Sequence, residues 1–536
     1  MAAFHPADAG NTYQYHTSGL VLRARLTFII GTYTYGMPPQ IENETQVKNV
    51  MNQALRYARQ RVEYADLLYE KIVRIEIQQL PDRLLQKPFN IKARVQLRLL
   101  EQGKKVEIKV GTLNPDSLKD AIDTGVRLLK LSPTPPQPVR LAPIPNPEKI
   151  RYGTAAPRLL PAGAIFTSLL KDINKIARVL ERKNPGMEIK PEFWFFSQRE
   201  EKAIADSTGV FKTQVMPRTF LQLVTRVKGL GGKMTQTRAR LGNPLPYSFI
   251  VRKTKNTYHL TPEAARHIRS WMEKTVELQK AITLNAEEIK SLTHFVLHFT
   301  TLGVFVHEAL GHNFEADIVK AGSSGIIDQE GYPLGIVAAE NVNILDGPLP
   351  GNPRDGFGTE FIDDEGVEVK TKLLAENGVI KGMIHNRETA AYFNAEPNGG
   401  AFSELGDQRI PRMSNTFVQP ATRKNWFRTL DKLIADIPKG LILEGTSGGA
   451  VSKDGMSSSV LIGYLIENGR ITRTVQPANF SAQTLHALRY VEGFAGPVRI
   501  DDVGFCGKGQ TKYVGDGGPV WTRIRNNEFV NLSIQG

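Results

Sequence analysis

Glycine is distributed unevenly along this chain of 536 residues, and its distribution separates two regions of different texture. Residues 301–536 hold 32 of the 47 glycines, and glycine concentrates where short strands are joined by tight turns. Two segments there, 373–384 and 464–475, place Asn-Gly between apolar runs, which is the strongest short-range signal of a β-hairpin. The C-terminal half is therefore predicted to be predominantly β.

The preceding region mixes helical and strand patterns. Apolar residues at three- and four-residue spacing, with cap signals, predict helices at 45–71, 114–131, 164–186 and 261–282. Strands are predicted at 73–80, 91–113, 191–209 and 211–227. Asn114, followed by Pro115 and Asp116, has the composition of a helix cap and first turn. Because the strands come in hairpin-like pairs, the region is interpreted as α/β with an antiparallel tendency.

Together these patterns predict an α+β protein. We expect an N-terminal appendage at 1–44 with strand-like pieces at 20–36, an α/β domain at 45–285, and a Gly-rich, predominantly β domain at 286–536. Residues 133–161 contain nine prolines and little hydrophobic periodicity. They are interpreted as a linker or an extended excursion of the α/β domain.

The net charge of +14 raises the question of nucleic-acid binding. Residues 1–300 hold 46 Lys and Arg against 26 Asp and Glu, whereas residues 301–536 hold 22 against 28. Such asymmetry is typical of domains with different partners or of a charged face between them. The basic residues alternate with acidic and apolar ones, as at 54–66, and no zinc finger, RNA-binding signature or basic tail occurs. We therefore predict no nucleic-acid partner.

Targeting and redox features favour a cytoplasmic protein. No apolar stretch reaches the roughly 18–20 residues that span a bilayer, so no membrane association is predicted. The first residues lack the basic and apolar regions of a secretory signal. The single cysteine, Cys506, excludes a disulfide within these residues and indicates a reducing compartment or a thiol with a function.

One segment, 303–317, has the residue types of a metal site: His307, Glu308 and His312 lie among apolar residues. Histidines four residues apart on a helix face one metal, but these are five apart, about 140° around the axis. A one-residue widening of the π-bulge type would restore the facing, and Gly311 is the residue expected to permit it. The alternative is a helix end with incidental polar residues, although unpaired polar groups in an apolar setting are costly. The pattern favours a metal.

Two imidazoles leave a catalytic zinc site one protein ligand short of three. Cys506 lies among glycines at 503–510, which let the backbone turn around it. A lone cysteine is more often a small buried hydrophobe, and that alternative stays open. If Cys506 is the third ligand, the open fourth position favours catalysis. Glu308 is then the expected general base, which takes a proton from the attacking water and passes it to the leaving amine.

Two other polar groups have a structural interpretation. His294 and His298 are four residues apart, but their segment alternates as a strand does, and four strand residues span about 13 Å. They are interpreted as wall or core histidines. The acidic run 363–365 fits paired acid–base groups or a hard-cation site, but Gly366 after it favours a polar hairpin turn.

In several segments the chain resembles the TldD/PmbA family of metalloproteases, and within it the catalytically complete TldD-type subunit. The segments are GVFVHEALGHNFEAD (303–317), FIDDEGVEV (361–369), LAENGVIKG (374–382), RIPRMSNTF (409–417), GYLIENGRI (463–471) and FCGKGQ (505–510). They occur in the family's order, and weaker similarity at 54–70 and 200–209 extends the resemblance to about residue 45. The HExxxH spacing followed by a late CGK is a specific signature.

The resemblance implies that His307, His312 and Cys506 bind one Zn²⁺ per chain and that Glu308 is catalytic. It implies an α/β domain followed by a β-rich catalytic domain, and a homodimer or a heterodimer with a related subunit that lacks the metal site. The family's enclosed active site admits short or unfolded peptides, held in extended form by strand addition. The predicted function is therefore zinc-dependent hydrolysis of peptide bonds.

Two alternatives to this function are weighed. A non-catalytic, peptide-binding partner subunit occurs in the family, but it lacks the HExxxH residues and the cysteine, which are intact here. An amide hydrolase of a modified peptide would share the metal site and differ in the lining of its cavity. The chain departs from the family's pattern after Cys506, at 397–409, at 1–40 and at 133–161.

Overall fold

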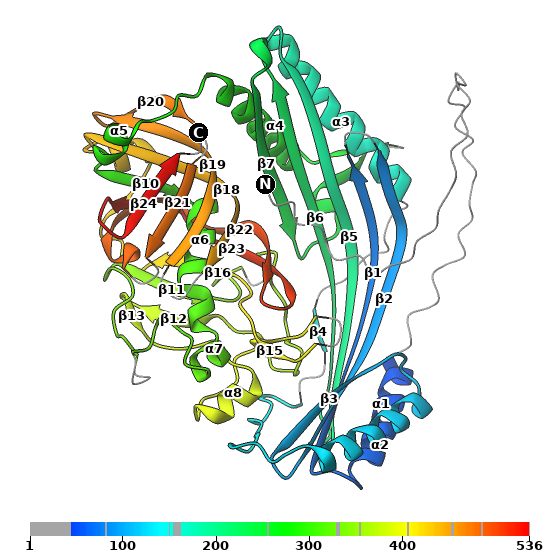
Figure 1. Cartoon of the computed structure of the whole chain (residues 1–536). Helices are drawn as coiled ribbons and strands as arrows, with labels where there is room; N and C mark the ends of the chain where they lie inside the picture. The colour runs from blue at the N-terminus through cyan, green and yellow to red at the C-terminus, as the bar shows by residue number, and fades with distance from the viewer. Residues whose placement is uncertain are drawn as a thin grey trace. The chain divides into compact units, whose positions relative to one another are not determined.

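A long antiparallel sheet forms the N-terminal half of the described chain (Figure 1). The computed structural model describes residues 44–536 apart from 81–82, 149–150, 154–161, 255–256, 329–332, 353–354, 405–406, 452–454, 477, 484–485 and 535–536. The predicted strand-like pieces at 20–36 lie outside the described residues. The strands of this first sheet are β1 (Tyr64–Gln79), β2 (Leu84–Glu101), β3 (Lys104–Val110), β4 (Arg151–Gly153), β5 (Glu188–Asp206), β6 (Phe211–Lys228) and β7 (Met234–Asn243). Their order is β3-β2-β1-β5-β6, with β4 and β7 both beside β6.

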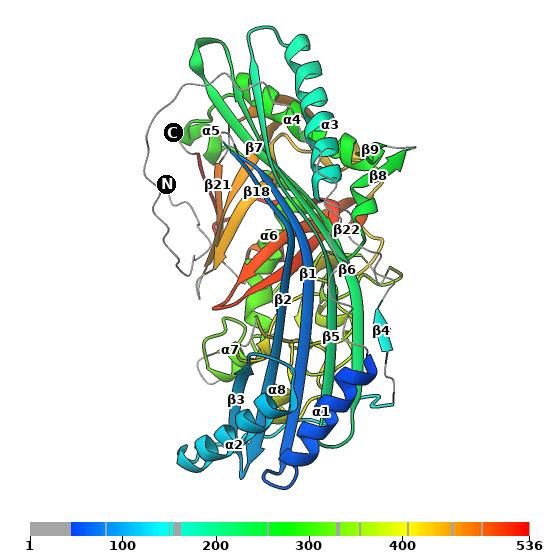
Figure 2. The ribbon, with the colours of Figure 1, turned by 90° about the vertical axis from the view of Figure 1, so that its right-hand side faces the viewer.

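Four helices pack on one face of this sheet, and the C-terminal half packs on the other (Figures 1 and 2). The helices are α1 (Glu44–Ala58), α2 (Pro115–Leu131), α3 (Ala162–Lys183) and α4 (Pro262–Glu277). Alternation along β5 separates the faces, because Phe195 packs with α3 and α4 while Phe196 packs with Phe357 and Val503. On β1, Leu67 and Leu68 divide in the same way.

The capping residues in the sequence correctly predicted where α2 and α4 begin. The Asn114 side chain accepts a hydrogen bond from the Ser117 amide at 2.8 Å, and the Thr261 hydroxyl caps α4. The predicted helix at 45–71 was wrong beyond Ala58, because the chain enters β1 at Tyr64. The first half of β1 is buried on both faces and lacks the apolar–polar alternation that would identify it, whereas the strand predicted at 73–80 corresponds to its second half.

A larger sheet forms most of the C-terminal half. Its strands are β10 (His294–His298), β11 (Val342–Asp346), β12 (Lys372–Glu376), β13 (Val379–Ile380), β16 (Thr416–Pro420), β17 (Trp426–Phe427), β18 (Lys439–Val451), β19 (Gly455–Glu467), β20 (Arg470–Val475), β21 (Ala478–Gln483), β22 (Val491–Gly507), β23 (Thr511–Arg525) and β24 (Val530–Ile534). The order is β13-β12-β11-β16-β23-β10-β18-β19-β21-β24, with β22 beside β23 and β17, and β20 beside β19.

Short elements complete the described fold. They are the strand pairs β8 (Val251–Thr254) with β9 (Thr257–Leu260) and β14 (Ala401–Phe402) with β15 (Ile410–Pro411), and the helices α5 (Ala286–Lys290), α6 (Phe299–Val306), α7 (Ala316–Lys320), α8 (Arg387–Tyr392) and α9 (Leu430–Ile434). No helix among the described residues has the length and hydropathy needed to cross a bilayer.

Both predicted Asn-Gly hairpins are confirmed. Asn377 and Gly378 join β12 to β13 with φ of 50° and 75°, and Asn468 and Gly469 join β19 to β20 with φ of 51° and 74°. Turns with two positive φ values match the twist of the strands they join. The predicted mixed fold, with an α/β first half and a β-rich second half, is confirmed. Glu44–Gly536 is one compact unit, and the boundaries 1–44, 45–285 and 286–536 stay predictions.

The described part of the proline-rich segment, 133–148 and 151–153, is an extended excursion that contacts both halves. The carbonyl of Ala142 accepts a hydrogen bond from Nε of Arg387 at 2.6 Å, and the carbonyl of Pro145 accepts one from Nζ of Lys212 at 3.0 Å. Within the same segment, β4 lies parallel to β6.

Buried ion pairs join the first sheet to the C-terminal half. Arg98 of β2 contacts both Asp66 of β1 and Glu365, and all three side chains are at most 2% exposed. Asp364 contacts Arg94 of β2 at 3.0 Å and Lys202 of β5 at 2.6 Å. The acidic run 363–365 does form a turn, as predicted, but it is buried and its partners are basic side chains of the first sheet.

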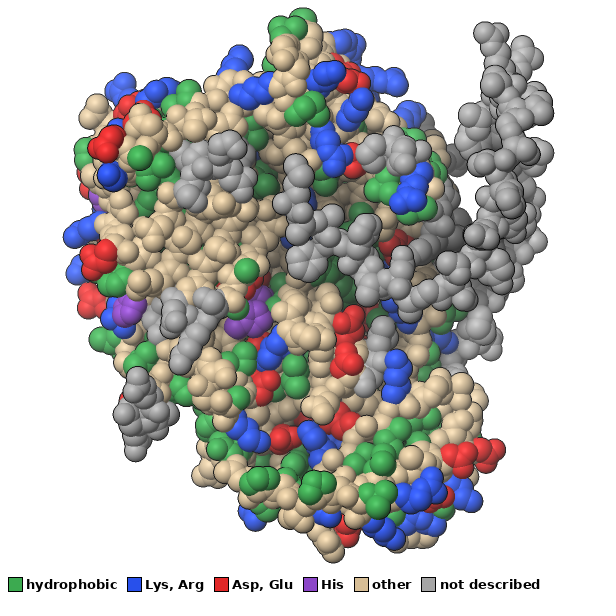
Figure 3. Space-filling model, viewed as in Figure 1, with side chains coloured by type: hydrophobic (Ala, Val, Ile, Leu, Met, Phe, Trp, Pro, Cys, Tyr) green, Lys and Arg blue, Asp and Glu red, His purple; other side chains and the backbone are tan. Residues whose placement is uncertain are grey.

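On the face shown in Figure 3, Lys and Arg side chains are interspersed with Asp and Glu.

Replacing Arg98 by Met tests this network. The substitution leaves the carboxylates of Asp66 and Glu365 buried with less compensation, so we expect the free energy of unfolding to fall by about 3–5 kcal/mol in a urea titration. Arg266→Met, which breaks an exposed pair with Glu263, is the control and should change it by less than about 1 kcal/mol. An Arg98→Met protein as stable as wild type would contradict this role.

Candidate metal centre

Helix α6 packs closely against β23. Strand β10 leads directly into α6, which packs against β23 and β18. A Cβ atom on Gly303 would lie 2.8 Å from the backbone nitrogen of Gly517 and 3.0 Å from the carbonyl carbon of Asp516. Any larger residue at 303 would push helix and strand apart. The contact brings His307, one turn further on, beside the Asp516 side chain.

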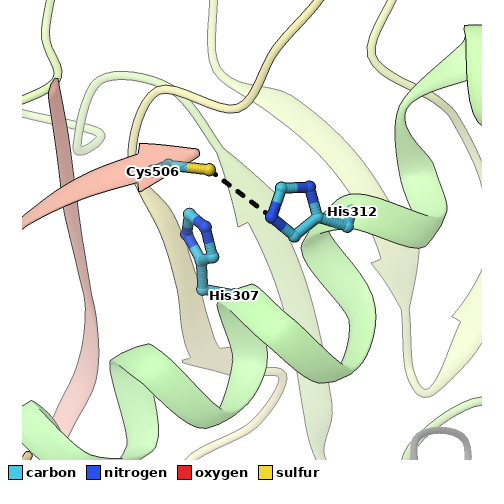
Figure 4. A group of neighbouring side chains, drawn as sticks. All are labelled: His307, His312 and Cys506. Carbon is cyan, nitrogen blue, oxygen red and sulfur yellow. Dashed lines mark hydrogen bonds between the residues drawn. The ribbon is translucent and has the colours of Figure 1, made fainter. Parts of the chain in front are cut away.

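The helix widens where the two histidines lie. Residues His307–Gly311 form a π-helical turn, in which the amide of His312 donates to the carbonyl of His307, five residues back. The predicted widening is therefore confirmed. It turns both imidazoles to one side, with ring centroids 5.0 Å apart and ring planes at 90° (Figure 4).

Gly311 has a different role from the predicted one. Its φ of −52° and ψ of −50° are ordinary helical values, so no backbone freedom is required of it. A Cβ atom there would instead lie 2.0 Å from Sδ of Met413 and 3.3 Å from Oγ1 of Thr416. Gly311 thus lets the widened turn pack closely against the segment that contains Met413.

Cys506 completes a group of three potential metal ligands. It lies near the end of β22, paired with Lys512 of β23. Its Sγ is 3.4 Å from Nε2 of His312, and the ligand atoms of Cys506, His307 and His312 all lie within 4.8 Å of one another (Figure 4). All three residues are buried. The structure thus brings together residues that are 194 positions apart in the sequence.

Two carboxylates orient the rings. Oδ2 of Asp516 lies 3.0 Å from Nδ1 of His307 in a buried ion-pair contact. Glu315 holds Nδ1 of His312 at 3.0 Å and also contacts Nζ of Lys508, in the loop of Cys506, at 3.0 Å. Because both Nδ1 atoms are engaged, each ring offers Nε2 to a metal, which is the common arrangement in metal sites.

The charges of the centre stabilise one another. Burial raises the pKa of the Cys506 thiol, but the two imidazoles outweigh it and hold that pKa well below its usual range. Burial lowers the pKa of His312, but Glu315 and Cys506 raise it to about 9. Against burial, Asp516 and Cys506 hold the pKa of His307 well above its usual range. A thiolate beside two imidazoles is the donor set to which a metal binds with release of the ring protons.

Glu308 lies at the edge of the centre. Its Oε2 is 4.0 Å from Nε2 of His312, and its side chain is half-buried. Gly449 of β18 lies against it, because a Cβ atom there would be 2.7 Å from Cγ of Glu308. Burial raises the pKa of Glu308, although His307 and His312 lower it. A carboxylate in this position can exchange a proton with a group bound at the metal.

The other histidines singled out in the sequence lie elsewhere. His294 and His298 are on β10, as predicted, and Nε2 of His294 lies 3.2 Å from Glu492. Nδ1 of His298 lies 2.8 Å from the hydroxyl of Thr300. Neither belongs to the group of potential ligands formed by the described residues.

Sequence reasoning missed Asp516 and Glu315. Glu315 follows His312 by three residues, a spacing at which helical side chains meet, and this signal could have identified it. Asp516 contacts His307 only because α6 packs on β23, so no local signal points to it.

Comparisons with known proteins find similarity to metalloproteases. Residues 292–525 match the family model described as the PmbA/TldA metallopeptidase C-terminal domain. A "Metalloprotease" of Methanothermobacter thermautotrophicus is 40% identical over 227 residues, 42% of this chain and 47% of that protein. A "Metalloprotease" of Archaeoglobus fulgidus is 31% identical over 356 residues, 66% of this chain and 74% of that protein. A "Zinc metalloprotease TldD homolog" of Saccharolobus solfataricus is 31% identical over 221 residues, 41% of this chain and 47% of that protein.

The chain thus spans about half the length of two of these relatives and about three quarters of the third. Among solved structures, TldE from Thermococcus kodakarensis is similar with a TM-score of 0.69 and 15% identity, covering 90% of this chain and 100% of that one. At that identity the likeness shows a shared fold.

Gly311→Ala tests the packing of the widened turn. Alanine is favoured over glycine in an ordinary helix by about 1 kcal/mol, but here its Cβ would overlap Met413. We expect a net loss of about 1–3 kcal/mol in the free energy of unfolding, measured in urea. The double variant Gly311→Ala/Met413→Ala should lose less than the sum of the two single variants. A more stable Gly311→Ala protein would show that the close contact does not constrain the turn.

Proposed function

The chain belongs to the PmbA/TldD family of metalloproteases, and from this premise we propose that it is a zinc-dependent peptidase. It would hydrolyse small or unfolded peptides bound in extended form. The observation that carries the proposal is the convergence of His307, His312 and Cys506, with Glu308 beside them.

The three side chains fit one zinc ion per chain. Two imidazole nitrogens and a thiolate are ligands that zinc prefers, and three protein ligands leave a fourth position open, as catalytic sites require. Tetrahedral ligands at ordinary Zn–N and Zn–S distances are about 3.5 Å apart. The 3.4 Å between Sγ of Cys506 and Nε2 of His312 is close to this value. Asp516 and Glu315 supply the orienting carboxylates.

Zinc bound there would polarise the scissile carbonyl and lower the pKa of an attacking water. Side chains of the protein would transfer the protons. Glu308 is near enough to accept a proton from that water and to donate it to the leaving amine. Its half-buried position raises the pKa of Glu308. A carboxyl group with a raised pKa can more readily take up a proton and release it again during the reaction.

Strand β18 supports binding of an extended peptide. Its pairing with β10 covers Gly440–Leu443, and beyond Leu443 no described strand pairs with that side of β18, because the chain of β10 has turned into α6. Residues 447–451 are exposed, and Gly449 lies against Glu308. A peptide added along this edge would pass Glu308 with its backbone amides satisfied. A cytoplasmic homodimer or heterodimer with a related subunit is part of the same proposal.

Metal content and turnover test the function together. Elemental analysis should give about one zinc per wild-type chain, and His312→Ala should lose it because one of three ligands is removed. Glu308→Gln should keep zinc and cleave peptides at least about 10²-fold more slowly, the range of general acid–base catalysis.

Three outcomes would change the assignment. Retained cleavage by Glu308→Gln would remove Glu308 from the base role. A Cys506→Ala protein that binds zinc as tightly as wild type would dismiss Cys506 as a ligand. A folded wild type that takes up no metal after incubation with zinc would favour a non-catalytic, peptide-binding subunit.

Asp516→Asn tests the orienting carboxylate separately. An amide holds the ring of His307 less strongly than a carboxylate, so zinc affinity should fall about 10- to 100-fold in competition with a chelator. Asp436→Asn, at an exposed side chain paired with Arg523, is the matched control and should leave zinc affinity unchanged. Equal affinity in both variants would show that Asp516 does not act on the metal.

A further inference from the structure

A cavity lies between β7, α4, β18 and β22. It has a volume of about 290 Å³ and is lined by residues of β7, α4, α6, β18 and β22. This is near the lower limit of small-ligand pockets, about 300 Å³. Strand β7 lies beside β18 and β22, so the first sheet supplies one wall and the C-terminal half another (Figures 1 and 2).

Four charged side chains of the cavity neutralise one another in pairs. Lys274 of α4 contacts Glu444 of β18. Nε of Arg499 on β22 donates to Oδ1 of Asp501 at 3.0 Å. These pairs leave Arg238 and Arg240 of β7 as the remaining cations of the lining.

Arg238 and Arg240 lack a carboxylate partner of their own. They lie on the face of β7 opposite Thr237 and Ala239, which pack toward α4. Within the described residues, no carboxylate oxygen is within ion-pair distance of either guanidinium group. Arg238 donates to the backbone carbonyl of Ser447, and Arg240 donates to backbone and amide oxygens.

The remaining carboxyl group of the lining, Asp502, does not balance them. Four Lys and Arg and three acidic side chains line the cavity beside His267 and His298, whose pKa values burial lowers to about 4, which leaves a charge of +1 even with Asp502 ionised. Burial and the neighbouring Asp516 raise the pKa of Asp502 well above its usual range, although the charges of Arg240 and Arg238 lower it. Burial and the charge of Arg240 lower the pKa of Arg238 to about 9, although Asp502 raises it. A bound anion would stabilise both guanidinium groups.

The cavity lies within a short peptide's reach of Glu308. Thr446 of β18 lines it, and Gly449 of the same strand lies against Glu308. Three strand residues span about 10 Å, and a bulge lies between Thr446 and Gly449. On its other side, Asp502 is paired across the sheet with Asp516, the residue that contacts His307.

We propose that this cavity is a subsite for a carboxylate of the peptide substrate, held by Arg238 and Arg240 about three residues from the scissile bond. The inference rests on the proposed peptidase function. Guanidinium groups bind carboxylates through two parallel hydrogen bonds, which suits this chemistry. A peptide antiparallel to β18 runs from Gly449 toward Thr446, so the carboxylate lies on the C-terminal side of the scissile bond. It belongs either to the peptide's C-terminus or to an Asp or Glu side chain.

Three labelled hexapeptides of alanine and phenylalanine distinguish the two sources. One has a free C-terminus, one is a C-terminal amide, and one is an amide with a single Glu near its C-terminus. Cleavage by the zinc-loaded wild type is followed by mass spectrometry, and binding is measured in parallel with zinc-loaded Glu308→Gln. We expect the free acid or the Glu peptide to be bound and cleaved at least about tenfold better than the neutral amide, the size of one charge-assisted interaction.

Matched arginine variants locate the effect. Arg238→Gln and Arg240→Gln should bring the ratio of acidic to neutral peptide toward one. Arg226→Gln should keep the wild-type ratio, because Arg226 lies on β6, bonds to Gln236 and is not part of the cavity lining. Thermal melting confirms that each variant is folded, and Arg238→Lys, which keeps the charge without the planar fork, should give an intermediate ratio.

The outcomes separate this inference from the proposed function. Equal binding of all three peptides, or no binding of any, overturns the carboxylate subsite. A preference unchanged in Arg238→Gln and Arg240→Gln also overturns it. Preferential binding without cleavage by the wild type supports the subsite while contradicting the peptidase function. Preference for the free acid assigns the subsite to the C-terminus, and preference for the Glu peptide assigns it to a side chain.

Discussion

The contact between α6 and β23 is the constraint on which the metal centre depends. Gly303 and Gly517 let the helix backbone approach the strand more closely than any side chain would allow. The neighbour of Gly517, Asp516, is thereby brought to His307, and the π-helical turn that follows brings His312 to the same side. A regular α-helix at the same place would point the two rings about 140° apart. The site therefore needs both the glycine contact and the widened turn.

The short segment 409–413 connects the metal centre to the first sheet. Arg409 pairs with Asp66 of β1 inside the buried ion network. Three residues later, Arg412 donates to the carbonyl of Cys506 at 2.7 Å, and Met413 fills the space beside the widened turn. The first sheet contributes none of the three potential ligands, yet it anchors the segment that holds the Cys506 loop. Burying such ion pairs is costly unless each charge is compensated, so the two halves fit together in one arrangement.

Local chemistry explains which parts could be predicted. The Asn114 cap, the two Asn-Gly hairpins and the widened turn at 307–311 each depend on residues within about five positions, and each was readable from the sequence. The strand at 64–79 was predicted only from residue 73 onward, because burial of its first half on both faces removes the alternation that marks a strand. The burial of the acidic run 363–365 depends on Arg98 and Lys202, far away in sequence. Asp516 was missed for the same reason.

The charge asymmetry of the sequence has an internal explanation in part. Basic residues of the first sheet meet acidic residues of the C-terminal half, which is one of the two arrangements that the asymmetry indicated. Each arginine that is buried in the described residues has a carboxylate within 4.0 Å; these are Arg94, Arg98, Arg218, Arg387, Arg409 and Arg412. Arg238 and Arg240, which are half-buried at the wall of the cavity between β7, β18 and β22, have no carboxylate within that distance among the described residues. Leaving such charge uncompensated destabilises a fold, and an anionic group on the substrate is the compensation that the position of the cavity makes available.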